Sequence, residues 1–221
     1  MRPGTETGGQ KTRTFVEQAR RAQVVESAIE VIAKEGYANA SLARIARHTG
    51  ISRGLISYHF AGKDELISRV LVTVFGEVAA YMGPRVEAER TAVGQLRAYI
   101  ESNLAYMDAH RSRIAAVVEI ISGGGLATLG VDPIQAEEES LMPLAELFRR
   151  GQVDGEFRAF DPLIMARSVR GVIDSMAPRV TDVDLDLKAC ARELTTLFEL
   201  ATRNPSRRDN ESPDVSGAKP S

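Results

Sequence analysis

The sequence predicts an all-α protein. Apolar residues recur at the three- and four-residue spacing of amphipathic helices along most of the chain. No segment shows the apolar–polar alternation of a half-buried strand. Residues 1–13 and 203–221 differ, because they are rich in small, polar and charged residues and carry no apolar period. We therefore expect a flexible basic arm at the N-terminus, a disordered tail at the C-terminus and helices between them.

Four helices are expected in the first part of the chain. The apolar residues from Val24 to Ile32 predict the first helix, which Gly36 terminates as a C-terminal cap. Two short helices follow, and then a longer one that begins near Lys63 and is ended or kinked at Pro84. The expected ranges are about 15–35, 41–48, 52–59 and 63–83.

Five more helices are expected in the second part. An aspartate followed by proline favours a helix start, because the carboxylate caps free N–H groups and proline has a helical φ. This pair occurs at Asp132-Pro133 and Asp161-Pro162, and Asp182 is a further candidate cap. The expected ranges are about 91–109, 111–122, 133–152, 161–177 and 183–202.

Charge is distributed unevenly along the chain. The net charge is only −2, but residues 1–63 hold ten basic and five acidic residues, and the remainder holds 18 basic and 25 acidic. A basic N-terminal segment on an acidic body is typical of a small phosphate-contacting module joined to a larger scaffold.

Composition also bears on the cellular location of the protein. Hydrophobic residues make up 43% and charged residues 26%, which is ordinary for a globular protein. Cys190 is the single cysteine, so no internal disulfide is possible. No uninterrupted apolar run approaches the roughly 18 residues that span a bilayer. We expect a cytoplasmic protein with no membrane contact.

Residues 41–60 have the spacing of a helix-turn-helix. Ala46 is small where two helix backbones must approach, and Gly50, four positions later, tolerates the positive φ of the turn. Ser41 and Ser52 are suited to cap the two helices. Three isoleucines are expected to point inward and hold the pair together: Ile45, Ile51 and Ile56.

This stretch resembles the TetR family of bacterial transcriptional regulators. The matching residues are Gly36-Tyr37, Ser41, Ile45-Ala46, Gly50-Ile51-Ser52, Arg53-Gly54, Tyr58-His59-Phe60 and Lys63-Asp64-Glu65-Leu66. The resemblance covers about residues 20–70. It implies a three-helix DNA-binding domain at 14–62 and a larger helical domain for effector binding and dimerisation at 63–202. Leu55 and Ser57 depart from the pattern, since threonine and tyrosine are common there, so the operator sequence does not follow by analogy.

The resemblance implies that the helix at 52–59 enters the major groove of double-stranded DNA at a palindromic operator. Arg53 is expected to donate to a guanine edge, beside Leu55 and Ser57. Tyr58, His59 and Lys63 are expected to contact phosphates. The complete predicted set is Ser41, Arg44, Ser52, Arg53, Gly54, Leu55, Ser57, Tyr58, His59 and Lys63. Basic residues of the first helix and arm are further candidates: Lys11, Arg13, Arg20 and Arg21.

The larger domain is expected to bind an unknown small-molecule effector and to form a homodimer through the helices near 161–177 and 183–202. The apolar stripes of these two helices equally fit an ordinary core. The acidic side chains of Glu119 and Asp174 are compatible with a cationic effector, whereas the guanidinium of Arg170 is compatible with an anionic one. The candidate effector-binding residues are Phe75, Tyr99, Asn103, Tyr106, Met107, Glu119, Met142, Phe148, Met165 and Arg170.

The favoured hypothesis is therefore a repressor that a small molecule releases from its operator. An activator would use the same DNA contacts. A ligand-sensing or protein-interaction module without operator binding is the alternative from another class, which Leu55 and Ser57 keep open. The histidines and the cysteine are scattered, and no acid, base or nucleophile set is clustered. We expect no metal, no cofactor and no enzymatic activity.

Overall fold

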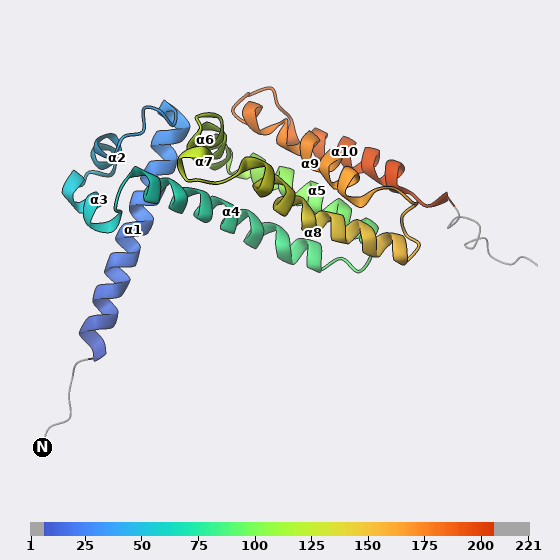
Figure 1. The fold of residues 1–221 in the computed structure, drawn as a ribbon, viewed down its shortest axis with the longest axis horizontal. Coiled ribbons are helices and arrows are strands. Elements are labelled where there is room, and N and C mark those ends of the chain that lie inside the picture. Colours follow the sequence, from blue (N-terminus) through green and yellow to red (C-terminus); the bar gives the residue numbers. More distant parts are fainter. Residues whose placement is uncertain (1–6, 206–221) are drawn as a thin grey trace, which may run out of the picture. The chain divides into compact units, whose positions relative to one another are not determined.

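The computed structural model describes residues 7–205, and the side chains of residues 16–205. The prediction of an all-α fold is confirmed, because the regular elements of this range are helices and the pairing of Phe157 with Arg203 is an isolated bridge. The chain divides into two compact units. Figure 1 labels their helices.

The first unit comprises residues up to Ala80, then 106–136 and 175–185. Its elements are α1 (Thr7–Glu35), α2 (Leu42–Thr49), α3 (Arg53–His59), the start of α4 (Lys63–Glu87), α6 (Arg111–Ser122), α7 (Gly125–Thr128) and the 3-10 helix η1 (Ala177–Arg179). One apolar core joins α1, α2, α3, α4 and α6. Ile29, Ile45, Ile56 and Ile120 are among its buried members. The helix-turn-helix is therefore part of a packed unit.

The second unit comprises residues 81–105, 137–174 and the chain from Asp186 onward. It contains most of α5 (Ala92–Ala109) and of α8 (Pro133–Val153), together with α9 (Pro162–Asp174) and α10 (Leu187–Thr202). Phe148, Phe157 and Phe160 form an aromatic cluster with ring centres 5.4 to 6.2 Å apart. These rings fix the turn between α8 and α9 against the core of the unit.

Helix α4 is apolar and long enough to cross a membrane by length and composition alone, with a mean hydropathy of 1.4 in its most apolar window. In the structure, however, the apolar face of α4 packs into the core of the first unit. The side chains of Leu66, Ile67, Val70 and Val74 are completely buried in the core of the first unit. This burial accounts for the apolar composition of α4.

Two helix starts that rest on an Asp-Pro pair are confirmed. The carboxylate of Asp132 accepts a hydrogen bond from the N–H of Ile134 at 2.9 Å, and α8 begins at Pro133. The carboxylate of Asp161 accepts from the N–H of Leu163 at 2.8 Å, and α9 begins at Pro162. Both carboxylates satisfy N–H groups that have no partner within the helix.

The end of α9 and the start of α10 were predicted wrongly. α9 ends at Asp174 instead of residue 177, and α10 begins at Leu187 instead of residue 183. Asp186 caps α10 in place of Asp182, because it accepts from the N–H groups of Lys188 and Ala189. Burial explains the choice of cap: Leu187 is the first buried residue of the helix, at 1% exposed, whereas Val183 is 96% exposed.

The first helix was predicted to start too late. α1 begins at Thr7, so residues 7–13 of the predicted arm are helical and only residues 1–6 of that prediction lie outside the described residues. Apolar periodicity marks the packed part of a helix, and residues 7–13 have none. Residues 206–221 of the predicted tail also lie outside the described residues. α4 continues one turn beyond Pro84 to Glu87.

Candidate DNA-binding surface

The turn between α2 and α3 is formed by the residues that were predicted to form it, namely Ser41, Gly50 and Ser52. Ser41 and Ser52 each accept a hydrogen bond at 3.2 Å from a backbone N–H three residues later, at Arg44 and Leu55. Gly50 has φ +73°, and its N–H bonds the carbonyls that end α2. A side chain at this position would favour a different backbone. The capped turn fixes where α3 begins.

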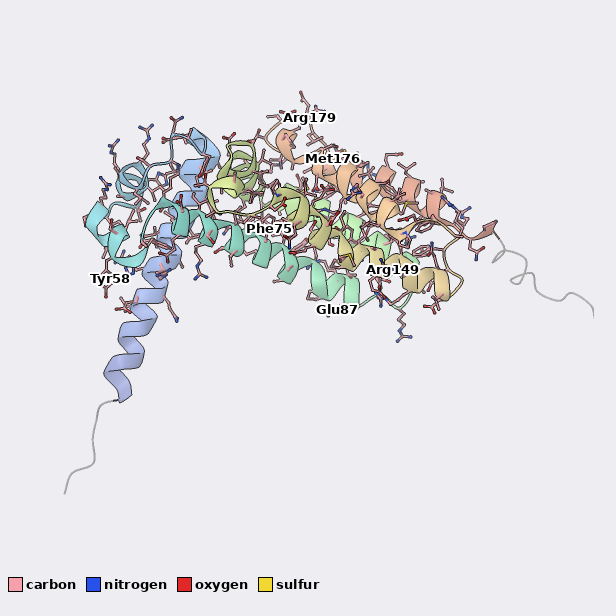
Figure 2. All side chains as sticks on the ribbon, in the orientation of Figure 1. Tyr58, Phe75, Glu87, Arg149, Met176 and Arg179 are labelled. Carbon is pink, nitrogen blue, oxygen red and sulfur yellow. The ribbon has the colours of Figure 1, made fainter. Side chains whose placement is uncertain are left out.

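The outward side of α3 is polar and open to solvent. Arg53, Gly54 and Ser57 are exposed, and Leu55 is partly exposed. The side chain of Tyr58, in the last turn of α3, is 66% exposed (Figure 2). Arg53 has no hydrogen-bond or ion-pair partner among the described residues. Its guanidinium is therefore available to a ligand outside the chain.

Two other predicted contact residues already have partners within the domain. The guanidinium of Arg44 forms an ion pair with Glu35, which keeps Arg44 at the C-terminal end of α1. The Nζ of Lys63 donates to the backbone carbonyl of Tyr37 at 2.8 Å and lies 4.2 Å from the centre of its ring. Desolvation lowers the pKa of Lys63. Because the side chains of Arg44 and Lys63 have partners within the domain, they are less available to bind DNA than the side chain of Arg53.

His59 lies differently from the prediction of a phosphate contact. Its side chain is 8% exposed, so little of the ring can reach a phosphate. Its backbone carbonyl accepts a hydrogen bond from Arg21 of α1. The assignment of His59 to phosphate stays a prediction that this burial does not favour.

Arg21 was considered as a phosphate contact, but in the structure it joins α1 to the link between α3 and α4. Besides its bond to the His59 carbonyl, it pairs with Glu65 at 2.9 Å and lies 4.5 Å from the ring centre of Phe60. The N–H of Ala61 donates to Glu65 at 2.6 Å, and this bond together with Arg21 lowers the pKa of that carboxyl. Sequence patterns did not reveal this role, because the partners lie about 40 residues away.

The ten candidate effector-binding residues are divided between the two units. Phe75, Tyr106, Met107 and Glu119 belong to the first, and the other six belong to the second. The side chains of Phe75 and Met142 are 50% and 48% exposed, which fits a surface position better than a cavity wall. The role of the ten residues stays a prediction.

Three of the six candidates in the second unit are polar and lie on two helices. The hydroxyl of Tyr99 on α5 accepts a hydrogen bond from Arg170 on α9 at 3.4 Å, and Arg170 pairs with Asp174 at 2.9 Å. Asn103, one turn after Tyr99, is buried. Thr195 on α10, which was not among the predicted residues, is also buried in this unit. A threonine within an apolar stripe gives no signal before its surroundings are known.

Two hollows of the structure lie elsewhere. One, of about 340 Å³, lies between α1 and α4 and is lined by residues that include Arg21 and Arg69. The other, of about 250 Å³, lies between α5 and α10 and is lined by residues that include Leu104 and Leu187. Neither is lined by a predicted effector residue. Among the described residues, no three histidine, cysteine or acidic side chains are grouped to hold a metal ion.

The fold and the capped, outward-facing α3 define a helix-turn-helix domain. The model of the bacterial regulatory proteins of the tetR family matches residues 24–70. Residues 24–70 of the chain therefore resemble the N-terminal domain of the TetR family.

Known relatives extend the comparison. The HTH-type transcriptional regulator BetI 1 of Chromohalobacter salexigens is 33% identical over 85 residues, which are 38% of this chain and 42% of that protein. The chain thus matches less than half of the length of this curated relative.

Solved structures resemble a larger part of the chain. The regulator FadR of Bacillus subtilis in complex with stearoyl-CoA has a TM-score of 0.68 at 20% identity, covering 80% of this chain and 96% of that one. AibR in complex with isovaleryl coenzyme A and operator DNA has a TM-score of 0.66 at 19% identity, covering 84% and 99%. At these identities the likeness supports the fold of both units.

Proposed function

We propose that this protein is a homodimeric transcriptional repressor that binds a palindromic operator and is released by a small-molecule effector. The observation that carries the proposal is the capped helix-turn-helix, whose α3 presents Arg53, Ser57 and Tyr58 to solvent. A polar helix of this kind enters the major groove, where its N-terminal residues meet base edges. Arg53 lies in the first turn of α3, where it can donate two hydrogen bonds to a guanine.

Dimerisation follows from the same proposal. Exposed apolar side chains on α9 and α10, namely Ile164 at 65%, Leu197 at 54% and Leu200 at 56%, would be covered if these helices packed against a second copy as a four-helix bundle. A twofold dimer presents two copies of α3 to two half-sites, about 34–36 Å apart on one face of the DNA.

The effector would act by changing which dimer geometry is favoured. A ligand that binds better to a form with a different spacing of the two α3 helices weakens operator binding, typically by about 1–3 kcal/mol of coupling free energy. The complexes of FadR with stearoyl-CoA and of AibR with isovaleryl coenzyme A and operator DNA support a small-molecule effector for this chain. The proposal requires no cofactor and no enzymatic step, and it places the protein in the cytoplasm with its DNA.

DNase footprinting and gel shift on the DNA that flanks the protein's own gene test this proposal. We expect a protected palindrome, with affinity that falls steeply as salt rises because phosphate contacts release counterions. Binding to all fragments with equal affinity, or to none of them, would support the alternative of a sensing or interaction module without an operator. A reporter gene behind the protected site then separates repression from activation.

A further inference from the structure

The segment that connects α9 to α10 belongs to the first unit, although both helices belong to the second. The chain leaves the second unit after Asp174 and returns to it at Asp186, and residues 175–185 cluster with the first unit. We call residues 175–185 the strap. Its regular structure is the short helix η1, and Met176 and Arg179 of the strap are labelled in Figure 2. Through the strap, the ends of α9 and α10 are continuous with the unit that holds the helix-turn-helix.

Two side chains hold the strap within the first unit. Val180 is 1% exposed, so its side chain is buried like that of a core residue. Arg111 is the first residue of α6, and its Nη1 donates to the backbone carbonyls of Val180 at 2.8 Å and Asp182 at 3.2 Å. Its Nη2 donates to the carbonyl of Leu185 at 3.4 Å and to the carboxylate of Asp108 at 2.6 Å. The guanidinium therefore binds the strap at three successive points.

This set of contacts requires a guanidinium. Arg111 has five N–H donors in one plane, so it can serve several carbonyls and a carboxylate together, whereas the ammonium of a lysine acts as a single point charge. Hydrogen bonds from a charged donor are also stronger than those from a neutral one. The ion pair with Asp108 lies within one turn of the chain and orients the guanidinium toward the strap. Arg111 thus favours one conformation of an otherwise irregular segment.

The same turn of α6 binds two helices of the DNA-binding domain. The guanidinium of Arg113 donates to the two carboxylate oxygens of Glu26 on α1, at 3.1 and 3.0 Å, and pairs with Glu77 on α4 at 3.2 Å. The hydroxyl of Tyr106 donates to the same Glu77 carboxylate at 3.1 Å. Residues two apart on a helix point in different directions, so Arg111 and Arg113 hold different segments from one turn.

From these contacts we infer that Arg111 is a positioning residue for operator binding. It fixes the strap to the first turn of α6, and it thereby couples α9 and α10, which carry the proposed dimer interface, to α1 and α4. The inference rests on the proposed function. A palindrome is bound tightly only when the second α3 helix is held near its half-site, and a loose connection lowers this effective concentration. Arg111 therefore determines how strictly the dimer selects the spacing of two half-sites, while it contacts no base.

Gel shift with Arg111→Gln, on the operator found by footprinting, tests the inference. Three duplexes are compared: the palindrome, an isolated half-site, and a palindrome whose half-sites are moved apart by about two base pairs. We expect the variant to bind the half-site like the wild type and the palindrome about tenfold more weakly. It should also discriminate less against the lengthened site. Sedimentation velocity should show an unchanged dimer.

Three outcomes overturn the inference. The first is that Arg111→Gln matches the wild type on all three duplexes. The second is that its half-site affinity falls as much as its palindrome affinity, because Arg111 then supports only the folded domain. The third is that the variant is a monomer, because Arg111 then acts on assembly itself.

Matched variants separate positioning from general stability. Arg179→Gln is the control, because the side chain of Arg179 is 67% exposed and pairs with Asp182 inside the strap. It should leave the ratio of palindrome to half-site affinity unchanged, and a loss equal to that of Arg111→Gln contradicts the inference. Asp108→Asn keeps the shape of the side chain but removes the charge that orients Arg111, so it should lower the ratio by a smaller factor. If Arg111→Gln does not fold, an unchanged ratio in Asp108→Asn overturns the inference.

The wild-type measurements keep this test apart from that of the proposed function. A wild type that binds a palindrome no more tightly than a half-site fails the proposed function, and the inference fails with it. A wild type that binds the palindrome as a dimer, while Arg111→Gln behaves identically, keeps the proposed function and lacks the inferred coupling.

Discussion

Arg53 and Lys63 are both basic residues of the predicted DNA-binding surface, but their surroundings differ. Arg53 is exposed on the first turn of α3, whereas Lys63 is held by the carbonyl and the ring of Tyr37. A free guanidinium at a helix N-terminus can align with one base pair, while an ammonium anchored to the domain fixes only the position of a nearby phosphate. The two residues should therefore contribute differently to operator binding.

We expect Arg53→Ala to relax the preference for one base pair in each half-site by about 1–3 kcal/mol. Lys63→Ala is the comparison, and it should weaken binding to all sequences and lower the slope of log K against log salt by about one. Gel shift on a set of single-base operator variants at several salt concentrations measures both effects. An equal loss on every sequence for Arg53→Ala would show that Arg53 does not read a base.

Gly50 is required for its backbone and not for its small size. Its φ is +73°, yet a Cβ built at this position would meet no atom within 4 Å. We expect Gly50→Ala to destabilise the protein by about 1–2 kcal/mol, the cost of the left-handed conformation for a residue with a side chain. Urea unfolding followed by circular dichroism measures this loss. Gly62→Ala is the control, because that glycine has an ordinary φ and an equally open site, and its substitution should change stability little.

At the scale of elements, local signals predicted helices α2, α3, α8 and α9 to within a few residues, because each begins at a cap that bonds its own N–H groups. The start of α10 was missed for a physical reason. Asp182, Asp184 and Asp186 are all suitable caps in sequence, and the choice depends on the burial of Leu187 against the rest of the unit. The burial of Leu187 depends on segments that are distant in the sequence, so the residues next to it do not reveal it.

The cap of α10 makes stability depend on pH. Hydrogen bonds from the N–H groups of Ala189 and Lys188 lower the pKa of Asp186, so its carboxylate stabilises the folded protein above the pKa of the unfolded chain, about 3.9. This contribution is lost as the pH falls through the lower pKa of the folded state. Asp186→Asn keeps a cap but removes the charge. We expect the Tm of the variant to lie below that of the wild type at neutral pH.

Thermal unfolding between pH 7 and pH 2.5 checks this expectation. The difference in Tm between wild type and Asp186→Asn should shrink below about pH 4 and vanish at the acid end. Glu65→Gln is a useful second variant, since the pKa of Glu65 is lowered in the same direction by bonds to Ala61 and Arg21 in the other unit. A difference in Tm that is constant with pH would mean that the charge of Asp186 does not stabilise α10.

At the scale of the whole molecule, the sequence predicted more about α3 than about the larger domain. The helix-turn-helix is a local motif, and its caps, turn and inward isoleucines all lie within 20 residues of one another. In the larger domain the contact between Tyr99 and Arg170 joins α5 to α9 across 71 residues of the chain. Tyr99, Asn103 and Arg170 were chosen as polar residues of helices, but only the structure shows which of their atoms lack a partner.

The proposed homodimer rests on the apolar side chains that one copy leaves exposed on α9 and α10. Leu197 is 54% exposed on α10, and a four-helix bundle with a second copy would bury it. We expect Leu197→Glu to shift the protein from dimer to monomer, because a carboxylate is strongly disfavoured in such an interface. Sedimentation velocity measures the change in mass, and circular dichroism shows that the variant remains folded.

The same variant connects assembly to DNA binding. Loss of the dimer removes the second α3 helix, so affinity for a complete palindrome should fall to that for a single half-site, whereas affinity for an isolated half-site should not change. Val183→Glu is the control, since Val183 is 96% exposed in the segment before α10 and has no place in the proposed bundle. If Leu197→Glu stays dimeric while Val183→Glu dissociates, the two copies meet outside α10 and the geometry of the operator must be derived from another interface.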